Sequence, residues 1–145
     1  MTPRRIVLDT NVCLDLFVFG DPRCAALRDA LDRGVVAAVT REDCRDEWLA
    51  VLEYARLGLD DAARETGRAL YDRYVTPFVA IDAVPALPRC GDPDDQKFLE
   101  LAATAGAKVL FSRDAELLRL SRRTSRDHGF AVVTPETWGS PHASL

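Results

Sequence analysis

The sequence predicts an α/β fold, a three-layer α/β/α sandwich whose central sheet is mostly parallel. Short apolar segments typical of buried strands alternate with segments whose apolar residues recur at helical spacing. Short loops join them, and strands that alternate with helices in this way form βαβ units and parallel sheets. We expect a single domain over residues 1–145, because a chain of this length can bury a sizeable core.

Five short apolar runs are the expected strands. Runs of this kind are typical of strands that are buried on both faces of a parallel sheet. They are residues 4–8, 35–39, 78–81, 108–111 and 131–133.

The first two expected helices are bounded by turn residues. Residues 11–19 can form a short helix, which Gly20 and Pro22 close. A second helix begins at Pro22 and continues until Gly34 stops it. Its apolar residues at helical spacing are Cys24, Leu27 and Leu31.

The later helices follow the second, third and fourth strands. Thr40 is the expected N-cap of one helix, in a sequence that resembles a capping box with Asp43 at its third position. The apolar face of this helix is expected to hold Cys44, Trp48, Val51, Leu52 and Ala55. Further helices are expected over residues 60–74, from 94 to about 105, and from 114 to about 122.

Composition excludes several classes of protein. The net charge of −4 and the pI of about 5.2 do not suit a protein that coats duplex DNA through its overall field, although clustered carboxylates would give the same balance. No apolar run exceeds five residues, whereas a membrane helix needs about 20, so we expect a cytoplasmic protein with no membrane partner. The four cysteines form no CxxC pair, and we expect reduced thiols packed as small apolar residues.

Four carboxylates are expected at one edge of the sheet. Asp9 directly follows the first strand, and Asp114 lies three residues after Phe111, the last residue of the fourth. The carboxyl ends of parallel strands share an edge, and sites form there. Glu47 lies within about 60° of the apolar face of its helix. Asp95 shares the inward face of the next helix and falls in its first turn.

Each acid taken singly has a structural explanation, as a helix cap or the partner of an arginine. Four carboxylates in one place repel one another and need a positive group among them. The only histidines are His128 and His142, so zinc is not favoured, and ligation by oxygen alone suits Mg²⁺ or Mn²⁺. Such ions activate water and stabilise phosphoryl displacement, and phosphodiester hydrolysis is therefore the inferred chemistry.

Three neighbouring acids compete for the third ligand position. Stepping back at 100° per residue from the buried face that Phe98 marks leads to Asp95 and not to Asp94. Asp92 precedes Pro93, which favours an extended backbone. We therefore expect Asp94 to begin the helix and Asp92 to lie in the preceding loop.

Four segments resemble those of the PIN-domain ribonucleases. They are DTN at residues 9–11, EWLAVL at 47–52, DPDDQKFLELA at 92–102 and VLFSRDAELL at 109–118. The resemblance covers nearly the whole chain in order. Among PIN proteins, the chain is most similar to the bacterial toxins of toxin–antitoxin pairs.

The resemblance implies a Mg²⁺- or Mn²⁺-dependent endoribonuclease that cleaves single-stranded RNA. It implies that the catalytic and metal-binding residues are Asp9, Glu47, Asp95 and Asp114. The positions that match supporting polar residues are Thr10, Asn11 and Ser112, the last commonly a threonine in the family. Glu116 matches an accessory acid. The implied partners are RNA, a cognate antitoxin and a second copy of the chain in a dimer.

Cations near the acids are expected to contact RNA phosphates, because about half or more of nucleic-acid contacts go to phosphate and sugar. The candidates are Arg113, Lys97 and Arg41. Arg113 either binds a phosphate or forms a salt bridge with one of the four acids. The arginines between Arg119 and Arg126 form a further patch, which is a solvated helix end, an RNA contact or a surface for an acidic partner.

Two other functions remain open. One is a non-catalytic PIN module that binds RNA or protein. The other is a phosphotransfer domain with Asp9 as nucleophile, although such a phosphatase has an acid where Asn11 stands. A receiver domain needs a suitably placed late lysine, and the last lysine here is Lys108, at the start of a strand.

Overall fold

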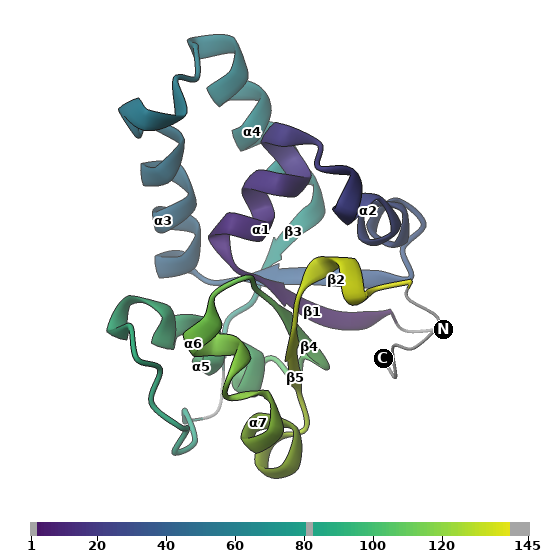
Figure 1. The fold of residues 1–145 in the computed structure, drawn as a ribbon, viewed down its shortest axis with the longest axis vertical. Coiled ribbons are helices and arrows are strands. Elements are labelled where there is room, and N and C mark those ends of the chain that lie inside the picture. Colours follow the sequence, from purple (N-terminus) through teal and green to yellow (C-terminus); the bar gives the residue numbers. More distant parts are fainter. Residues whose placement is uncertain (1–2, 81–82, 140–145) are drawn as a thin grey trace.

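A computed structural model describes residues 3–80 and 83–139 and contains a parallel five-stranded sheet (Figure 1). The strand order is β3-β2-β1-β4-β5, and each neighbouring pair is parallel. The strands are β1 (Arg4–Leu8), β2 (Val36–Thr40), β3 (Val75–Pro77), β4 (Val109–Phe111) and β5 (Ala131–Val133). The α/β class and the parallel sheet predicted from the sequence are confirmed.

Helices cover both faces of the sheet, which gives three layers (Figure 1). One face carries α1 (Thr10–Leu14), α2 (Ala25–Asp32), α3 (Glu42–Leu52) and α4 (Asp61–Tyr74). The other carries α5 (Gln96–Thr104), α6 (Ala115–Leu118) and α7 (Ser121–His128). Within residues 3–80 and 83–139, no helix has the length and apolar character needed to cross a membrane.

Alternation along the central strands divides the core in two. In β1, Ile6 and Leu8 pack with the helices α1 to α4, whereas Val7 packs with α5 and α6 on the opposite face. In β4, Phe111 belongs to the first core and Leu110 to the second. Successive side chains of a strand point to opposite faces, so a shift by one residue would exchange the two cores. The alternation therefore fixes where the carboxyl ends of β1 and β4 lie.

An aromatic cluster joins three helical segments on the first face. The Trp48 ring of α3 stacks on Tyr71 of α4 with a centroid separation of 5.4 Å and an interplanar angle of 15°. It meets the edge of Phe17 at 6.3 Å. Phe17 belongs to a π-helical segment, Asp15–Phe19, so the expected helix over 11–19 exists as α1 followed by a wider turn. Gly20 ends it with a φ of 58°.

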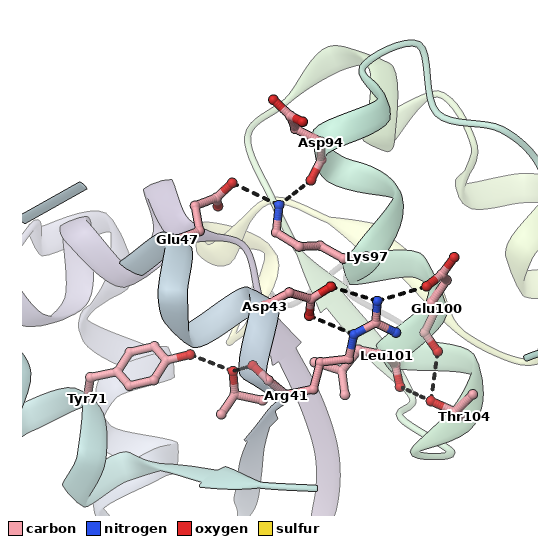
Figure 2. A network of polar contacts seen from close by, with 10 residues as sticks. Arg41, Asp43, Glu47, Tyr71, Asp94, Lys97, Glu100, Leu101 and Thr104 are labelled. Carbon is pink, nitrogen blue, oxygen red and sulfur yellow. Dashed lines mark hydrogen bonds and ion pairs between the residues drawn. The ribbon is translucent and has the colours of Figure 1, made fainter. Parts of the chain in front are cut away.

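The expected start and end of the α3 helix are both wrong. Thr40 is still part of β2, and Arg41 occupies the N-cap position without a side-chain capping bond. The buried hydroxyl of Thr40 instead lies 2.6 Å from the Tyr71 hydroxyl, so the two side chains share a hydrogen bond (Figure 2). Ala55 lies beyond the end of α3, in the short 3₁₀ helix Ala55–Leu57.

The strand expected at residues 78–81 is also wrong. The third strand of the sequence is β3, Val75–Pro77, and it follows α4 without an intervening loop. Pairing with β2 defines it, with Val75 beside Ala38 and Pro77 beside Thr40. Pro77 is tolerated because β3 is an edge strand. Ile81, the last residue of the expected strand, lies outside the described residues.

The helix expected over residues 114 to 122 is two helices. The chain leaves α6 after Leu118 and begins α7 at Ser121. α7 is tied to the sheet by the buried hydroxyl of Thr124, which donates to the carbonyl of Phe130 at 2.8 Å. The helix expected over 60–74 is confirmed as α4. The helix expected from 94 to about 105 exists as α5, but it begins only at Gln96, after the 3₁₀ turn Pro93–Asp95.

Removal of the Trp48 side chain tests the aromatic cluster. Trp48 is only 1% exposed, so Trp48→Ala leaves a large cavity, and we expect the free energy of unfolding to fall by about 3–5 kcal/mol. Val79 is 82% exposed, and Val79→Ala should change it by less than about 0.5 kcal/mol. Urea unfolding followed by circular dichroism measures both. Equal midpoints for the two variants would contradict this account of the core.

Candidate active site

Acidic side chains line a hollow of about 260 Å³ at the carboxyl ends of β1 and β4. Its acids are Asp9, Glu47, Asp92, Asp94, Asp95 and Asp114. Its other lining residues are Thr10, Asn11, Val51, Tyr54 and Arg56. The structure therefore brings together the four acids selected from the sequence, which come from four separate parts of the chain.

Asp9 lies at the bottom of the hollow, directly after β1. Its backbone N–H donates to the carbonyl of Phe111 at 3.0 Å, which fixes it to the end of β4. The side chain is almost fully buried, and it makes no capping bond to α1. Burial raises the pKa of Asp9, an effect that the hydrogen bond from Ser112 opposes.

Ser112 connects Asp9 to Asp114. Its hydroxyl donates to Asp9 Oδ2 at 2.7 Å and accepts the backbone N–H of Asp114 at 3.0 Å. Asp114 also caps α6, since its Oδ1 accepts the backbone N–H of Glu116 at 2.7 Å. The capping and site interpretations of Asp114 are therefore compatible, because one carboxylate oxygen suffices for the cap.

Glu47 is held from two sides on α3. The Thr10 hydroxyl donates to one carboxylate oxygen, and Lys97 Nζ lies 2.9 Å from the other (Figure 2). Lys97 also donates to the backbone carbonyl of Asp94. Burial lowers the pKa of Lys97, but the hydrogen bond and charge of Glu47, together with Cys44 and Asp95, raise it overall. Each Glu47 oxygen keeps a further lone pair for another donor or a cation.

Asp95 is the least compensated acid of the site. Burial, the charge of Asp9 and a hydrogen bond with Asp114 raise its pKa to about 7. This carboxyl is therefore only partly ionised at neutral pH, and a nearby positive charge would favour its ionised form. A divalent cation would provide such a charge.

The donor set fits Mg²⁺ or Mn²⁺ chemically. The potential metal ligands in the hollow are oxygen atoms, and its described lining residues include neither histidine nor cysteine. In the described part of the chain, no three Asp, Glu, His or Cys side chains form a ready group of metal ligands. Asp9, Glu47 and Asp114 each accept a hydrogen bond from a protein donor instead.

The expected helix start at Asp94 is wrong. Asp92 is the N-cap of the 3₁₀ turn Pro93–Asp95, and its Oδ1 accepts the backbone N–H of Asp94 at 3.0 Å. Asp94 lies exposed at the rim of the hollow. The extended backbone expected before Pro93 is what places Asp92 outside this turn, where an N-cap residue lies.

Arg41 and Arg113 are engaged by acids outside the hollow. Arg41 pairs with Asp43 at 2.7 Å and with Glu100 at 2.8 Å (Figure 2). Arg113 pairs with Asp15 at 2.8 Å and with Glu136 at 2.6 Å. The salt bridges of Arg113 therefore exist, but with acids other than the four site residues. Contact of Arg41, Lys97 or Arg113 with phosphate stays a prediction.

Glu116 and the arginine patch lie apart from the hollow. Glu116 pairs with Arg119, and its carboxylate lies so close to Gly91 that a Cβ there would clash with it. Arg126 pairs with Asp127, its neighbour on α7. None of the arginines between 119 and 126 lines the acidic hollow.

Two lining residues, Tyr54 and Arg56, were missed in the sequence. The helix expected to continue to Ala55 would contain Tyr54 and end just before Arg56, whereas α3 ends at Leu52. The signal that marks a turn is Gly58, which has a φ of 61°.

A family model for the PIN domain matches residues 5–116. The matched segment runs from β1 into α6 and contains every acid of the hollow. The chain therefore belongs to the PIN-domain family, which is a family of nucleases. No curated protein matches the chain.

Substitution of the cap residue tests the assignment of the helix start. Asp92→Ala should lower the free energy of unfolding by about 1 kcal/mol, because the N–H of Asp94 loses its acceptor. Asp92→Asn keeps a capping oxygen and should be close to the wild type. A larger loss of stability in Asp94→Ala than in Asp92→Ala would restore Asp94 as the cap. Urea unfolding measures all three variants.

The raised pKa of Asp95 predicts a pH dependence of stability in the presence of a chelator. Between its ordinary pKa of 3.8 and about 7, the folded protein binds more protons at this site than the unfolded chain. The free energy of unfolding should therefore fall as the pH rises through this range. Asp95→Asn should weaken the fall and stabilise the protein at pH 8. Urea unfolding at pH 5 and pH 8 measures it, and an unchanged pH dependence in the variant would contradict the shift.

Proposed function

We propose that the protein is a Mg²⁺- or Mn²⁺-dependent endoribonuclease that cleaves single-stranded RNA. The observation that carries the proposal is the gathering of Asp9, Glu47, Asp95 and Asp114 around one hollow in a chain of a nuclease family. Four acids from separate segments would be costly to keep together without a cation. Their oxygen-only donor set suits the ions that assist phosphodiester hydrolysis.

The four acids have distinct roles in this proposal. Asp9, Asp95 and Asp114 would hold the metal ion, since Asp95 is influenced by both of the others. Glu47 is oriented by Thr10 and Lys97 and offers its remaining lone pairs to the ion or to the attacking water. A bound divalent ion supplies acidity to that water and stabilises the charge on the phosphate. Ser112 would hold the orientation of the Asp9 carboxylate by its hydrogen bond to Oδ2.

The phosphotransfer alternative has less support. Asn11 stands at the rim of the hollow, where such a phosphatase would have a second acid. Lys108 lies next to β4 at its amino end and lines a different hollow together with Arg4. Lys108 therefore lies at the opposite edge of the sheet from Asp9, and it does not supply the lysine that a receiver domain needs beside its acids.

We also propose that the nuclease is the toxin of a toxin–antitoxin pair, on the basis of its family and of the motifs that resemble bacterial PIN toxins. A small protein encoded directly upstream, able to relieve growth arrest when it is produced together with this chain, would support the role. A genome position without such a neighbour would count against it. The dimer implied by the same resemblance stays a prediction.

Metal-dependent cleavage of RNA is the decisive measurement. We expect the wild type to cut a labelled single-stranded RNA with Mg²⁺ or Mn²⁺ and to lose this activity in EDTA. Asp9→Asn and Asp95→Asn should reduce the rate by orders of magnitude while the circular dichroism spectrum is unchanged, because the carboxylates that hold the ion are removed. Single-stranded DNA and duplex RNA of the same sequence serve as substrate controls.

Asp46→Asn is the matched control for these variants. Asp46 is the neighbour of Glu47 on α3, but its side chain is exposed and makes no hydrogen bond or ion pair within the described residues. Its variant should cut RNA at the wild-type rate. Cleavage that persists in EDTA or in Asp9→Asn would overturn the mechanism, and RNA binding without cleavage by the wild type would favour the non-catalytic module.

A further inference from the structure

The turn after α3 forms one wall of the acidic hollow. The chain leaves α3 at Leu52, forms the 3₁₀ helix Ala55–Leu57 and reverses at Gly58. Leu57 and Leu59 pack against the first core and anchor the turn from below. Tyr54 and Arg56 are exposed and line the hollow from this wall.

Charge makes Arg56 distinctive. Six acids line the hollow, and Arg56 is the one positively charged residue among the described residues that line it. The nearby cations Lys97, Arg41 and Arg113 are each paired with carboxylates. Arg56 forms no ion pair with the described residues, although six acids line the same hollow. Arg56 is therefore the nearby cation that can pair with a phosphate entering the hollow without first breaking a salt bridge.

Tyr54 offers an aromatic surface beside that charge. The guanidinium carbon of Arg56 lies 5.1 Å from the centroid of the Tyr54 ring, so the two side chains lie against each other. Tyr54 is 43% exposed, and its hydroxyl makes no hydrogen bond within the described residues. Its backbone carbonyl accepts the N–H of Leu57, so the turn depends on the main chain of Tyr54 and not on its ring.

From this arrangement we propose that Tyr54 and Arg56 form a nucleotide-binding subsite on the rim of the acidic hollow. An unpaired base of the RNA stacks on the Tyr54 ring, and Arg56 binds the phosphate next to it. Aromatic side chains and arginine planes recognise single-stranded nucleic acid in this way, because every base has a face that can stack. The subsite rests on the proposed function and extends it, since a paired base could not reach the ring.

Binding can be measured apart from cleavage in the Asp9→Asn background. The probe is a fluorescent single-stranded RNA oligonucleotide with Mn²⁺, followed by anisotropy. We expect Tyr54→Ala to weaken binding by about 5- to 150-fold, the range that stacking of one base contributes. Tyr54→Phe keeps the ring and should bind within about twofold of its parent, because only a hydroxyl without a partner is lost.

Arg56 has a different expected signature. Arg56→Ala should weaken binding and reduce the slope of log K against log salt by about 0.7, the value for one phosphate contact on a single strand. The matched control is Arg73→Ala. Arg73 lies over the ring of Tyr74 at the same 5.1 Å, but away from the hollow, and its removal should change neither affinity nor slope.

An oligonucleotide of abasic sugars and phosphates separates stacking from a structural effect. Without bases to stack, it should bind the Tyr54→Ala variant and its parent equally. If Tyr54→Ala weakens binding of this probe as much as binding of RNA, or if both Tyr54→Ala and Arg56→Ala bind RNA like their parent, the subsite is wrong.

Cleavage by the otherwise unchanged protein distinguishes this proposal from the proposed function. A wild type that does not cut RNA, but whose RNA binding depends on Tyr54 and Arg56 as described, retains the subsite and refutes the nuclease. A wild type that cuts RNA in a metal-dependent way with Tyr54→Ala and Arg56→Ala unaffected retains the nuclease and refutes the subsite. Absence of RNA binding in the wild type overturns both.

Discussion

Mutual repulsion of carboxylates at one edge of the sheet is the constraint on which the site depends. Six acids share a hollow of about 260 Å³, and each must be held near groups of its own charge. Hydroxyl, ammonium and backbone N–H donors stabilise four of them, Asp9, Glu47, Asp92 and Asp114. Burial, followed by the charges of Asp9 and Asp114, raises the pKa of Asp95 to about 7. The repulsion among these acids is therefore only partly offset by protein groups, and a bound cation would offset more of it.

Hydrophobic packing supplies the rigidity that this arrangement requires. The two hydrophobic cores pack against opposite faces of β1 and β4, because alternate residues of each strand point into different cores. The strands end at Leu8 and Phe111, and the next residues are Asp9 and Ser112. A hydrogen bond of 2.7 Å between two buried side chains needs strand ends that do not shift. The apolar interior thus positions the polar edge.

The sequence predicts the acids because their positions follow from local rules. An acid after a buried parallel strand lies at the carboxyl edge, and helix geometry favours Asp95 over Asp94. The features that the sequence predicts wrongly depend on partners far away in the chain. Arg113 pairs with Asp15, which lies 98 residues away in the sequence. β3 is defined by its pairing with β2, and Thr40 at the end of β2 shares a hydrogen bond with Tyr71 of α4, so neither feature follows from the neighbouring sequence.

The buried acids and the exposed turn after α3 address one physical problem, the entry of a polyanion into an acidic hollow. A divalent ion held by the acids would offset part of their negative charge, and Arg56 carries positive charge at the rim. In the proposed mode of binding both charges would act on the same RNA strand, so ion and RNA would each strengthen the binding of the other, and this linkage would be reciprocal. Tyr54 would add an attraction that is independent of charge. Stacking would remain effective when salt screens the phosphates, which would make an aromatic ring a useful partner for a site rich in acids.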